Sequence, residues 1–322
     1  MKRPGVSIVV PCFNYGRFLG DCLRSIFALE GDHDLEVIAI DDASTDDTPD
    51  ILRSFADPRL RVITHAKNQG HIVTINEGLS EARGELVARI DADDRYRPCF
   101  LEATVPPLRR HPEVGMVYGD AAMIDSTGRV TLASMDQVHG GRDHKGNELI
   151  TFLEKNIVCA PTVLARREAW QRALPIPAGL AFSDWYFTLE IARRHEVYFV
   201  AQVVADYRVH DRNHHTLIAR NRTEEGSIFR LLDGIYAAPE EDPALEARKQ
   251  AARGRVYAAH HLDLATKYFG FGERAQARRS YLAALRADPV LAGDPRTMRR
   301  LLATWLPTRV YEGLKGALGR RA

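Results

Sequence analysis

Three closely spaced carboxylates follow a short apolar segment in the first third of the chain. Asp91, Asp93 and Asp94 come directly after the run Glu85-Leu-Val-Ala-Arg-Ile90, which Gly84 precedes. Such a run predicts a buried strand, and side chains two residues apart on a strand share a face. Mg²⁺ and Mn²⁺ prefer oxygen ligands, and Mg²⁺ usually takes one or two carboxylates together with water and substrate phosphates. Asp91 and Asp93, which are two residues apart, therefore indicate a divalent-cation site for a phosphate-bearing substrate. An Asp-rich turn that only closes the strand would explain it equally well.

Alternating strands and helices would position this pair. Four apolar segments recur at intervals of 25 to 29 residues, with helical patterns in the connections. Leu19, Cys22 and Ile26 share a helix face after the first segment, as Ile51 and Phe55 do after the second. This predicts an α/β fold with a largely parallel sheet, whose ligands bind beyond the carboxyl ends of the strands. The predicted strands are Val6 to Val10, Leu35 to Ile40, Leu60 to Thr64 and Glu85 to Ile90.

The segments that follow the first two strands are candidates for the same site. Pro11 to Tyr15 follow the first strand, and Asp41 to Asp46 follow the second. Carboxylates gathered at one sheet edge repel a diphosphate unless a cation bridges them, so a nucleotide diphosphate here would need metal. Asp42 has another use, because a carboxylate only accepts hydrogen bonds and suits the ring N–H of uracil or thymine. The alternative is that this acidic segment supports the turn and caps the helix that begins near Thr48.

Six ordered blocks of the sequence form a larger pattern: Val6 to Tyr15, Ile38 to Thr48, Asn68 to Gly70, Gly84 to Asp94, Phe182 to Trp185 and Tyr207 to His210. These blocks resemble the family 2 glycosyltransferases, which have the GT-A fold. The resemblance covers roughly residues 5 to 215. It implies a mainly parallel central sheet flanked by helices, and transfer of a sugar from a nucleotide-activated donor to an acceptor hydroxyl with inversion.

The resemblance implies how the donor is held. It places Pro11 and Phe13 against the nucleotide and Asp42 on the base. The segment Asp91, Ala92 and Asp93 takes the place of the family's DXD motif, and Asp93 is implied as the direct metal ligand with Asp91 beside it. The implied cofactor is a divalent metal, Mg²⁺ or Mn²⁺, which would stabilise the departing nucleoside diphosphate.

On the acceptor side, the resemblance implies that Asp184 is the general base that removes the acceptor proton. Ser183 precedes it where the family usually has Glu, so this part of the pattern is incomplete. The pattern is also typical of an acid at a helix N-terminus. His210 falls where some relatives place a metal or diphosphate contact, and an ordinary loop histidine is the alternative. Trp185 either stacks on an acceptor sugar or fills the core.

Motifs of other nucleotide-binding classes are missing from the sequence. No Gly-x-Gly-x-x-Gly follows the first predicted strand and no Gly-x-x-x-x-Gly-Lys-Ser/Thr occurs, which argues against the dinucleotide and P-loop classes. No apolar stretch approaches about 18 residues, and no Gln-x-x-Arg-Trp motif occurs. A non-processive transferase is therefore expected rather than a membrane-embedded synthase. The 4 cysteines are widely scattered, which predicts neither a zinc site nor disulfides and fits a reducing compartment.

Length and charge indicate two parts in the 322 residues. We expect a catalytic domain over residues 1–220 and a helical, basic extension over residues 221–322. Residues 244–322 hold 16 Lys and Arg against 6 Asp and Glu, net +10, so with a total of +1 the preceding residues carry −9. Ala237 to Pro243 predict a linker between helices. Glu273 to Asp288 resemble the second helix of a tetratricopeptide unit, but such arrays normally need three or more units, so a helical hairpin that packs on the catalytic domain is expected instead.

The last predicted helix is basic and amphipathic. Leu301, Leu302 and Trp305 form an apolar stripe beside Arg299 and Arg300. Such a helix can lie on an anionic membrane surface, bury its stripe or form an oligomer contact. No nucleic-acid-binding motif accompanies the charge, so nucleic acid is not an expected partner. The expected location is the cytoplasm, with peripheral contact at the inner face of the plasma membrane left open.

Taken together, these features predict an inverting, metal-dependent glycosyltransferase of cell-surface or exopolysaccharide biosynthesis. The expected donor is a UDP-sugar, dTDP- and GDP-sugars stay open, and the acceptor would be a saccharide or lipid-linked saccharide. Two alternatives are an inactive nucleotide-sugar-binding protein and an interaction protein that works through its helical tail. Intact Asp91, Asp93 and Asp184 argue against both. The polar segment Met135 to Asn147 is expected to be a loop, either closing over donor or acceptor or plain surface.

Overall fold

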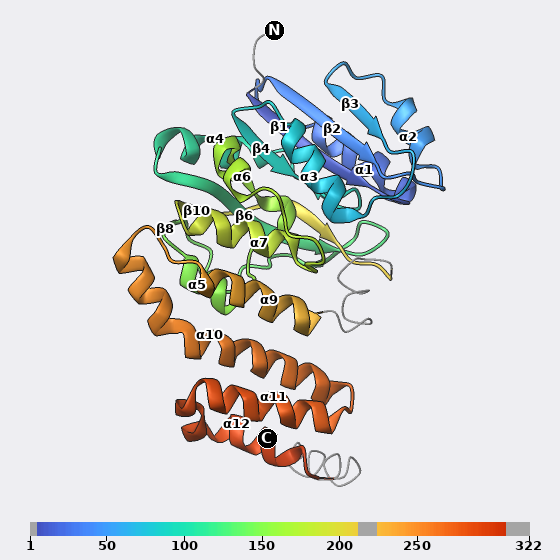
Figure 1. Cartoon of the computed structure of the whole chain (residues 1–322). Helices are drawn as coiled ribbons and strands as arrows, with labels where there is room; N and C mark the ends of the chain where they lie inside the picture. The colour runs from blue at the N-terminus through green and yellow to red at the C-terminus, as the bar shows by residue number, and fades with distance from the viewer. Residues whose placement is uncertain (1–4, 212–223, 307–322) are drawn as a thin grey trace. The chain divides into compact units, whose positions relative to one another are not determined.

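The computed structural model describes residues 5–211 and 224–306, and the chain divides into two compact units (Figure 1). The first unit consists of Met1–Phe152 with Asn156–Ser227, and the second of Leu153–Lys155 with Ile228–Ala322. The predicted boundary between residues 220 and 221 lies outside the described residues and stays a prediction.

Four parallel strands begin the first unit. They stand in the order β3-β2-β1-β4, and each neighbouring pair is parallel. The predicted strands and the helices between them are confirmed, and the carboxyl ends of the strands meet at one edge of the sheet. The strands are β1 (Val6–Cys12), β2 (Leu35–Asp41), β3 (Leu60–Thr64) and β4 (Leu86–Arg89), connected by α1 (Gly16–Phe27), α2 (Thr48–Ser54) and α3 (His71–Glu81).

Beyond β4 the sheet becomes mixed. β9 (Leu164–Arg166) lies between β4 and β6 (Val114–Ile124) and is antiparallel to both, and β6 then pairs in parallel with β10 (Glu196–Arg208). Short antiparallel strands complete ten strands within the described part of the chain: β5 (Arg95–Tyr96), β7 (Val130–Leu132) and β8 (His144–Gly146). The expectation of a loop over Met135 to Asn147 is therefore wrong at its end, because β10 offers an edge to which β8 pairs.

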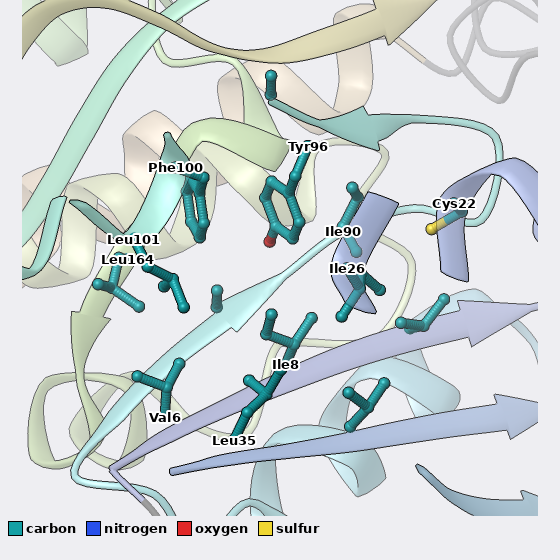
Figure 2. Packing of buried hydrophobic residues seen from close by; sticks show 14 of the residues in the cluster. Val6, Ile8, Cys22, Ile26, Leu35, Ile90, Tyr96, Phe100, Leu101 and Leu164 are labelled. Carbon is teal, nitrogen blue, oxygen red and sulfur yellow. The ribbon is translucent and has the colours of Figure 1, made fainter. Parts of the chain in front are cut away.

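Helices cover both faces of this sheet, which gives three layers. On one face, Val6 and Ile8 of β1 join a buried cluster with Ile26 of α1 and Leu101 of α4 (Figure 2). On the other face, α3 approaches so closely that a Cβ on Gly78 would lie 2.4 Å from Cγ1 of Val9. Alternate side chains of β1 thus pack against the helices on the two opposite faces of the sheet. The remaining helices of this part are α4 (Phe100–Arg110), α5 (Leu149–Glu154), η1 (Ala160–Thr162), α6 (Arg167–Ala173) and α7 (Ser183–Ala192).

The second unit is helical. Ala265, Tyr281 and Leu301 form a buried cluster that joins three of its helices. The linker predicted at residues 237–243 and the helix predicted at residues 273–288 are both confirmed by the helix bounds. None of the described helices is long and apolar enough to cross a membrane. The helices are α9 (Glu224–Ala237), whose first residues belong to the first unit, then α10 (Pro243–Gly270), α11 (Arg274–Ala287), η2 (Pro289–Gly293) and α12 (Pro295–Ala303).

Candidate functional site

A cavity of about 730 Å³ opens at the carboxyl ends of β1, β2 and β4. This is the place that the strand order predicts for a ligand. Its walls come from the segments that follow these strands, from the start of α3 and from the end of β10. Most of the predicted site residues line it together, namely Pro11, Phe13, Asp42, Asp91, Ala92, Asp93 and His210.

The turns after β1 and β2 are tied to each other beside the cavity. The backbone N–H of Asn14 donates to Ser44 Oγ over 2.9 Å, and that of Thr45 donates to Asn14 Oδ1 over 2.8 Å. Asn14 and Ala43 have φ angles of 57° and 60°, in a region that residues other than glycine rarely adopt. Backbone strain of this kind persists where the surroundings fix it, and it clusters at binding sites. The two turns therefore form a fixed wall, on which Phe13 is 42% exposed and available for stacking.

Asp42 is a buried carboxylate in the wall of the cavity. Its Oδ1 accepts from the N–H of Gln69 over 2.7 Å, and its Oδ2 accepts from the N–H of Gly70 over 2.9 Å. His65 Nδ1 lies 2.7 Å from Oδ1. Burial acts to raise the pKa of Asp42, but the hydrogen bonds from Gln69, His65 and Gly70 outweigh it and lower this pKa. Asp42 is therefore an ionised acceptor that faces the cavity.

Two other acids of the same turn support the turn and the adjoining helices, which was the alternative interpretation of this acidic segment. Asp41 Oδ1 accepts from the N–H of Ser44 over 3.0 Å. Asp46 accepts from the N–H groups of Thr48 and Gly16, each over 3.0 Å, and so supports the starts of α2 and α1. Turn support and a ligand-facing carboxylate therefore coexist in one segment.

The acidic segment after β4 meets the end of β10. Asp93 Oδ2 lies 3.0 Å from His210 Nε2, and both side chains are buried. The His210 ring packs on Phe18 with centroids 4.8 Å apart. Burial raises the pKa of Asp93, the hydrogen bond to His210 lowers it, and the neighbouring Asp91 carboxylate raises it; the net pKa is raised. Without a cation, burial and the repulsion between Asp91 and Asp93 therefore disfavour the charged form of Asp93.

Arg208 fixes this acidic segment to the sheet. Its Nε–H donates to the carbonyl oxygen of Asp93 over 2.7 Å, and its backbone N–H donates to Asp94 Oδ1 over 2.8 Å. The Arg208 side chain is only 1% exposed. Asp94 consequently ties the turn to β10, whereas Asp91 and Asp93 line the cavity. The three neighbouring acids have different roles that their spacing alone does not separate.

The residues present fit a divalent cation that a diphosphate also binds. Within residues 5–211 and 224–306, no three Asp, Glu, His or Cys side chains gather into a group that could hold a metal. Mg²⁺, however, usually takes only one or two carboxylates and completes its shell with water and phosphate oxygens. Asp91 and Asp93 can supply these two, and a cation would offset the burial and repulsion that raise the Asp93 pKa. His210 contacts the same carboxylate and can orient it.

Asp184 does not line the large cavity in the described part of the chain. It stands in the first turn of α7, where its Oδ2 accepts from Asn156 Nδ2 over 3.1 Å, and it borders a separate cavity of about 10 Å³. Buried Arg89 connects the two places. Its Nη1 donates to Ser183 Oγ over 3.0 Å, and its Nη2 donates to Asp91 Oδ2 over 3.3 Å. Asp184 is thus adjacent in sequence to a residue that Arg89 links to the acidic segment.

The structure also assigns residues that the sequence left open or missed. Trp185 belongs to the core, because it is 2% exposed and its indole N–H donates to the carbonyl oxygen of Phe152 over 2.7 Å. His65 lies behind Asp42, and only its position just after the third predicted strand could have pointed to it. Further cavity residues come from segments quoted in the motifs or next to them, and they are Tyr15, Phe18, Asn68, Gly70, Thr74 and Tyr207.

The part of the sequence that forms the cavity and most of the sheet matches known proteins. Residues 7–173 match the family model described as Glycosyl transferase family 2. The uncharacterized glycosyltransferase alr2836 of Nostoc sp. is 26% identical over 230 residues, which cover 68% of this chain and 69% of that protein. The succinoglycan biosynthesis protein ExoO of Rhizobium meliloti is 37% identical over 131 residues, which cover 41% of this chain and 35% of that protein. The match to ExoO thus spans about a third of its length.

The fold matches solved glycosyltransferase structures over most of the chain. Residues 1–349 of S. aureus TarS, in complex with UDP-GlcNAc, superimpose with a TM-score of 0.66 at 17% identity, covering 88% of this chain and 81% of that one. The mannosyltransferase PcManGT of Pyrobaculum calidifontis, in complex with GDP-Man and Mn²⁺, gives a TM-score of 0.62 at 21% identity, covering 98% and 85%. The architecture is therefore the GT-A fold with additional C-terminal helices.

Proposed function

The chain belongs to glycosyltransferase family 2, and from that membership we propose that it moves one sugar from a UDP-sugar to an acceptor hydroxyl with inversion. The observation that carries this proposal is the cavity at the carboxyl ends of the strands. An exposed aromatic ring, a carboxylate with room for one more donor and a pair of acids all face it. The aromatic ring can stack on a nucleobase, the carboxylate can accept a hydrogen bond from its ring N–H, and the pair of acids can bind the metal of a metal-bound diphosphate.

On the donor side, Phe13 would stack on the base with Pro11 beside it, and Asp42 would accept the ring N–H. The solved relative with UDP-GlcNAc supports a uracil nucleotide here, while the relative with GDP-Man keeps a guanine nucleotide as the competing outcome. Both bases carry a ring N–H that an ionised carboxylate can accept.

Asp91 and Asp93 would hold a divalent cation, Mg²⁺ or Mn²⁺, with His210 contacting the Asp93 carboxylate. When bound, the cation supplies stabilisation of the negative charge on the departing diphosphate. Arg208 and Asp94 keep the acidic segment in position through the hydrogen bonds described above.

We assign the general base to Asp184. Its carboxylate would take the proton of the acceptor hydroxyl while that oxygen bonds to the anomeric carbon. On the opposite face of the sugar, the bond from this carbon to the diphosphate oxygen breaks, and the electron pair leaves with the nucleoside diphosphate. The hydrogen bond from Asn156 and the Arg89 link through Ser183 support a fixed position for this group.

The acceptor is proposed to be a saccharide or a lipid-linked saccharide in cell-surface polysaccharide assembly. The ExoO match and its role in succinoglycan biosynthesis support this class. A lipid-linked acceptor would be met at the inner face of the plasma membrane, where the basic helices of the second unit could make peripheral contact. A catalytically inactive binding protein remains the competing outcome of the test that follows.

The test measures release of nucleoside diphosphate from UDP-, dTDP- and GDP-sugars, with Mn²⁺, with Mg²⁺ and with chelator. With a saccharide acceptor present, NMR of the product gives the configuration at the anomeric carbon. We expect metal-dependent turnover of one donor class with inversion. Binding of a donor without any turnover would support the inactive protein, and retention of configuration would contradict the role of Asp184.

A further inference from the structure

A chain of three ionisable side chains runs from the cavity wall into helix α3. Asp42 Oδ1 lies 2.7 Å from Nδ1 of His65, and His65 Nε2 lies 2.7 Å from Oε2 of Glu77. The side chains of Asp42 and His65 are 3% and 4% exposed, and that of Glu77 is 37% exposed. His65 follows the end of β3 directly, and Glu77 lies in the middle of α3. The imidazole thus connects a solvent-reaching acid to a buried acid that faces the cavity.

The partners of His65 determine its protonation. An ionised carboxylate has acceptors only, so each ring nitrogen must donate to satisfy both contacts. Burial lowers the pKa of His65, but the hydrogen bonds to Asp42 and Glu77 outweigh it and raise this pKa. A doubly donating imidazolium between two carboxylates has a fixed orientation. Asp42 therefore cannot turn without breaking this contact.

Counting the donors at Asp42 shows which atom is left for a ligand. Oδ1 already accepts from His65 and from the N–H of Gln69. Oδ2 accepts from the N–H of Gly70. A carboxylate oxygen has two acceptor positions, so one position on Oδ2 stays open in this arrangement. A base that reaches Asp42 must present a hydrogen-bond donor to that position.

We infer that His65 and Glu77 are positioning residues that set base selectivity, because they hold Asp42 so that Oδ2 accepts a ring N–H. Uracil and guanine present such an N–H, whereas the corresponding ring nitrogen of cytosine is an acceptor and would face the carboxylate unpaired. The inference rests on the proposed function, in which Asp42 contacts the base. It adds that the selectivity depends on two residues that do not touch the nucleotide.

The chain offers matched variants for a test. His65→Ala removes the contact, whereas His65→Asn keeps an N–H donor near the position of Nδ1. Glu77→Gln keeps an acceptor but removes the charge beside His65. Glu81→Gln is the control, because Glu81 lies one turn further along α3 and pairs with Arg61 at the surface.

Calorimetry with Mn²⁺ would give the Kd of UDP, GDP and CDP for each variant, and the readout is the ratio of the Kd for CDP to that for the best-bound diphosphate. For His65→Ala we expect this ratio to fall about tenfold or more, since a misplaced charged acceptor loses its discrimination. His65→Asn should recover part of it, Glu77→Gln should lower it severalfold, and Glu81→Gln should match the native protein. A merely structural pair would change the melting temperature and leave the ratio unchanged.

The results distinguish the positioning role of His65 and Glu77 from the proposed function itself. If the native protein binds UDP or GDP over CDP and the ratio stays native in Glu77→Gln and both His65 variants, the positioning role is overturned while the proposed function stands. Equal binding of CDP by the native protein also overturns it. If the native protein binds none of the diphosphates, the proposed function itself fails. Should His65→Ala not fold, Glu77→Gln carries the decision, because its site is partly exposed.

Discussion

At the scale of single residues, the aspartates of the site differ in their hydrogen-bond partners. Asp41 and Asp46 are occupied by backbone N–H groups of the turns, whereas Asp42 keeps an acceptor facing the cavity. Asp94 is occupied by Arg208, whereas Asp93 lines the cavity against His210. Neighbouring residues of identical chemistry thus have distinct roles.

The His65 contact predicts a pH dependence of stability. The raised pKa of folded His65 means that its stabilisation is fully present below its ordinary pKa of 6.5 and is lost as the pH rises through the raised value. The free energy of unfolding should therefore differ most between the native protein and Glu77→Gln at about pH 6, and the difference should shrink toward higher pH. Urea unfolding measured across this range gives the result. A difference that grows with pH would contradict a protonated His65.

The proposed role of Asp184 as general base predicts a kinetic defect when its carboxylate is replaced. Asp184→Asn keeps the size of the side chain and a partner for Asn156 but cannot take a proton, so kcat should fall about 10²- to 10⁴-fold. The KM for the donor should change little, because Asp184 does not line the donor cavity. Glu190→Gln is the control on the same helix, since Glu190 pairs with Arg193 and Arg194. A native kcat in Asp184→Asn would remove the assignment.

At the scale of elements, the close approach of α3 to the sheet positions the start of that helix at the cavity. Gly78 permits this approach, because an added Cβ would lie 2.4 Å from Cγ1 of Val9 and 2.7 Å from Cδ1 of Ile40. Both neighbours are fully buried and cannot move aside freely. The helix carries Thr74 and Glu77, and its close approach to the sheet depends on the missing side chain at residue 78.

Gly78→Ala should consequently destabilise the protein although alanine favours helices. We expect overpacking to cost about 1–3 kcal/mol, which exceeds the propensity gain of about 1 kcal/mol. Gly20→Ala in α1 is the control, because its added Cβ meets only the flexible end of Arg24, at 3.2 Å. That variant should be as stable as the native protein or more so. Thermal unfolding of both variants checks this, and a more stable Gly78→Ala would contradict the packing described.

Sequence patterns predicted the elements that local periodicity defines. β1 to β4, α1 and the acidic segment after β4 follow from apolar runs and from the residues that end them. Strands β5, β7 and β8 are two or three residues long, too short for a periodic signal, and they exist because β6 and β10 offer them edges. His65 was missed for a different reason, because its contacts are with residues 42 and 77, which only the fold brings together.

At the scale of the whole molecule, charge is divided between the two ends of the chain. Residues 244–322 carry a net charge of +10 and the preceding residues carry −9. In the second unit, Leu302 and Trp305 are 63% and 54% exposed, and they follow Arg299 and Arg300 by two to six residues in the sequence. Exposed apolar and basic side chains together are typical of a surface that contacts anionic lipid.

This predicts binding of the intact protein to anionic vesicles that weakens with salt. Replacing Leu302 and Trp305 by Ser, or Arg299 and Arg300 by Gln, should reduce sedimentation with phosphatidylglycerol vesicles severalfold. Arg248→Gln in α10 is the control for a change of charge away from this stripe. Equal sedimentation of all variants would show that the stripe does not contact lipid.

The central claim is that the cavity binds a nucleoside diphosphate through a metal held by Asp91 and Asp93. Calorimetry with UDP, dTDP, GDP and CDP, in Mn²⁺, Mg²⁺ or chelator, tests it on the native protein and on Asp93→Ala. We predict binding of one diphosphate class that needs metal and is lost in Asp93→Ala. Binding that persists in chelator and in Asp93→Ala, or no binding to any of the four, would contradict the claim.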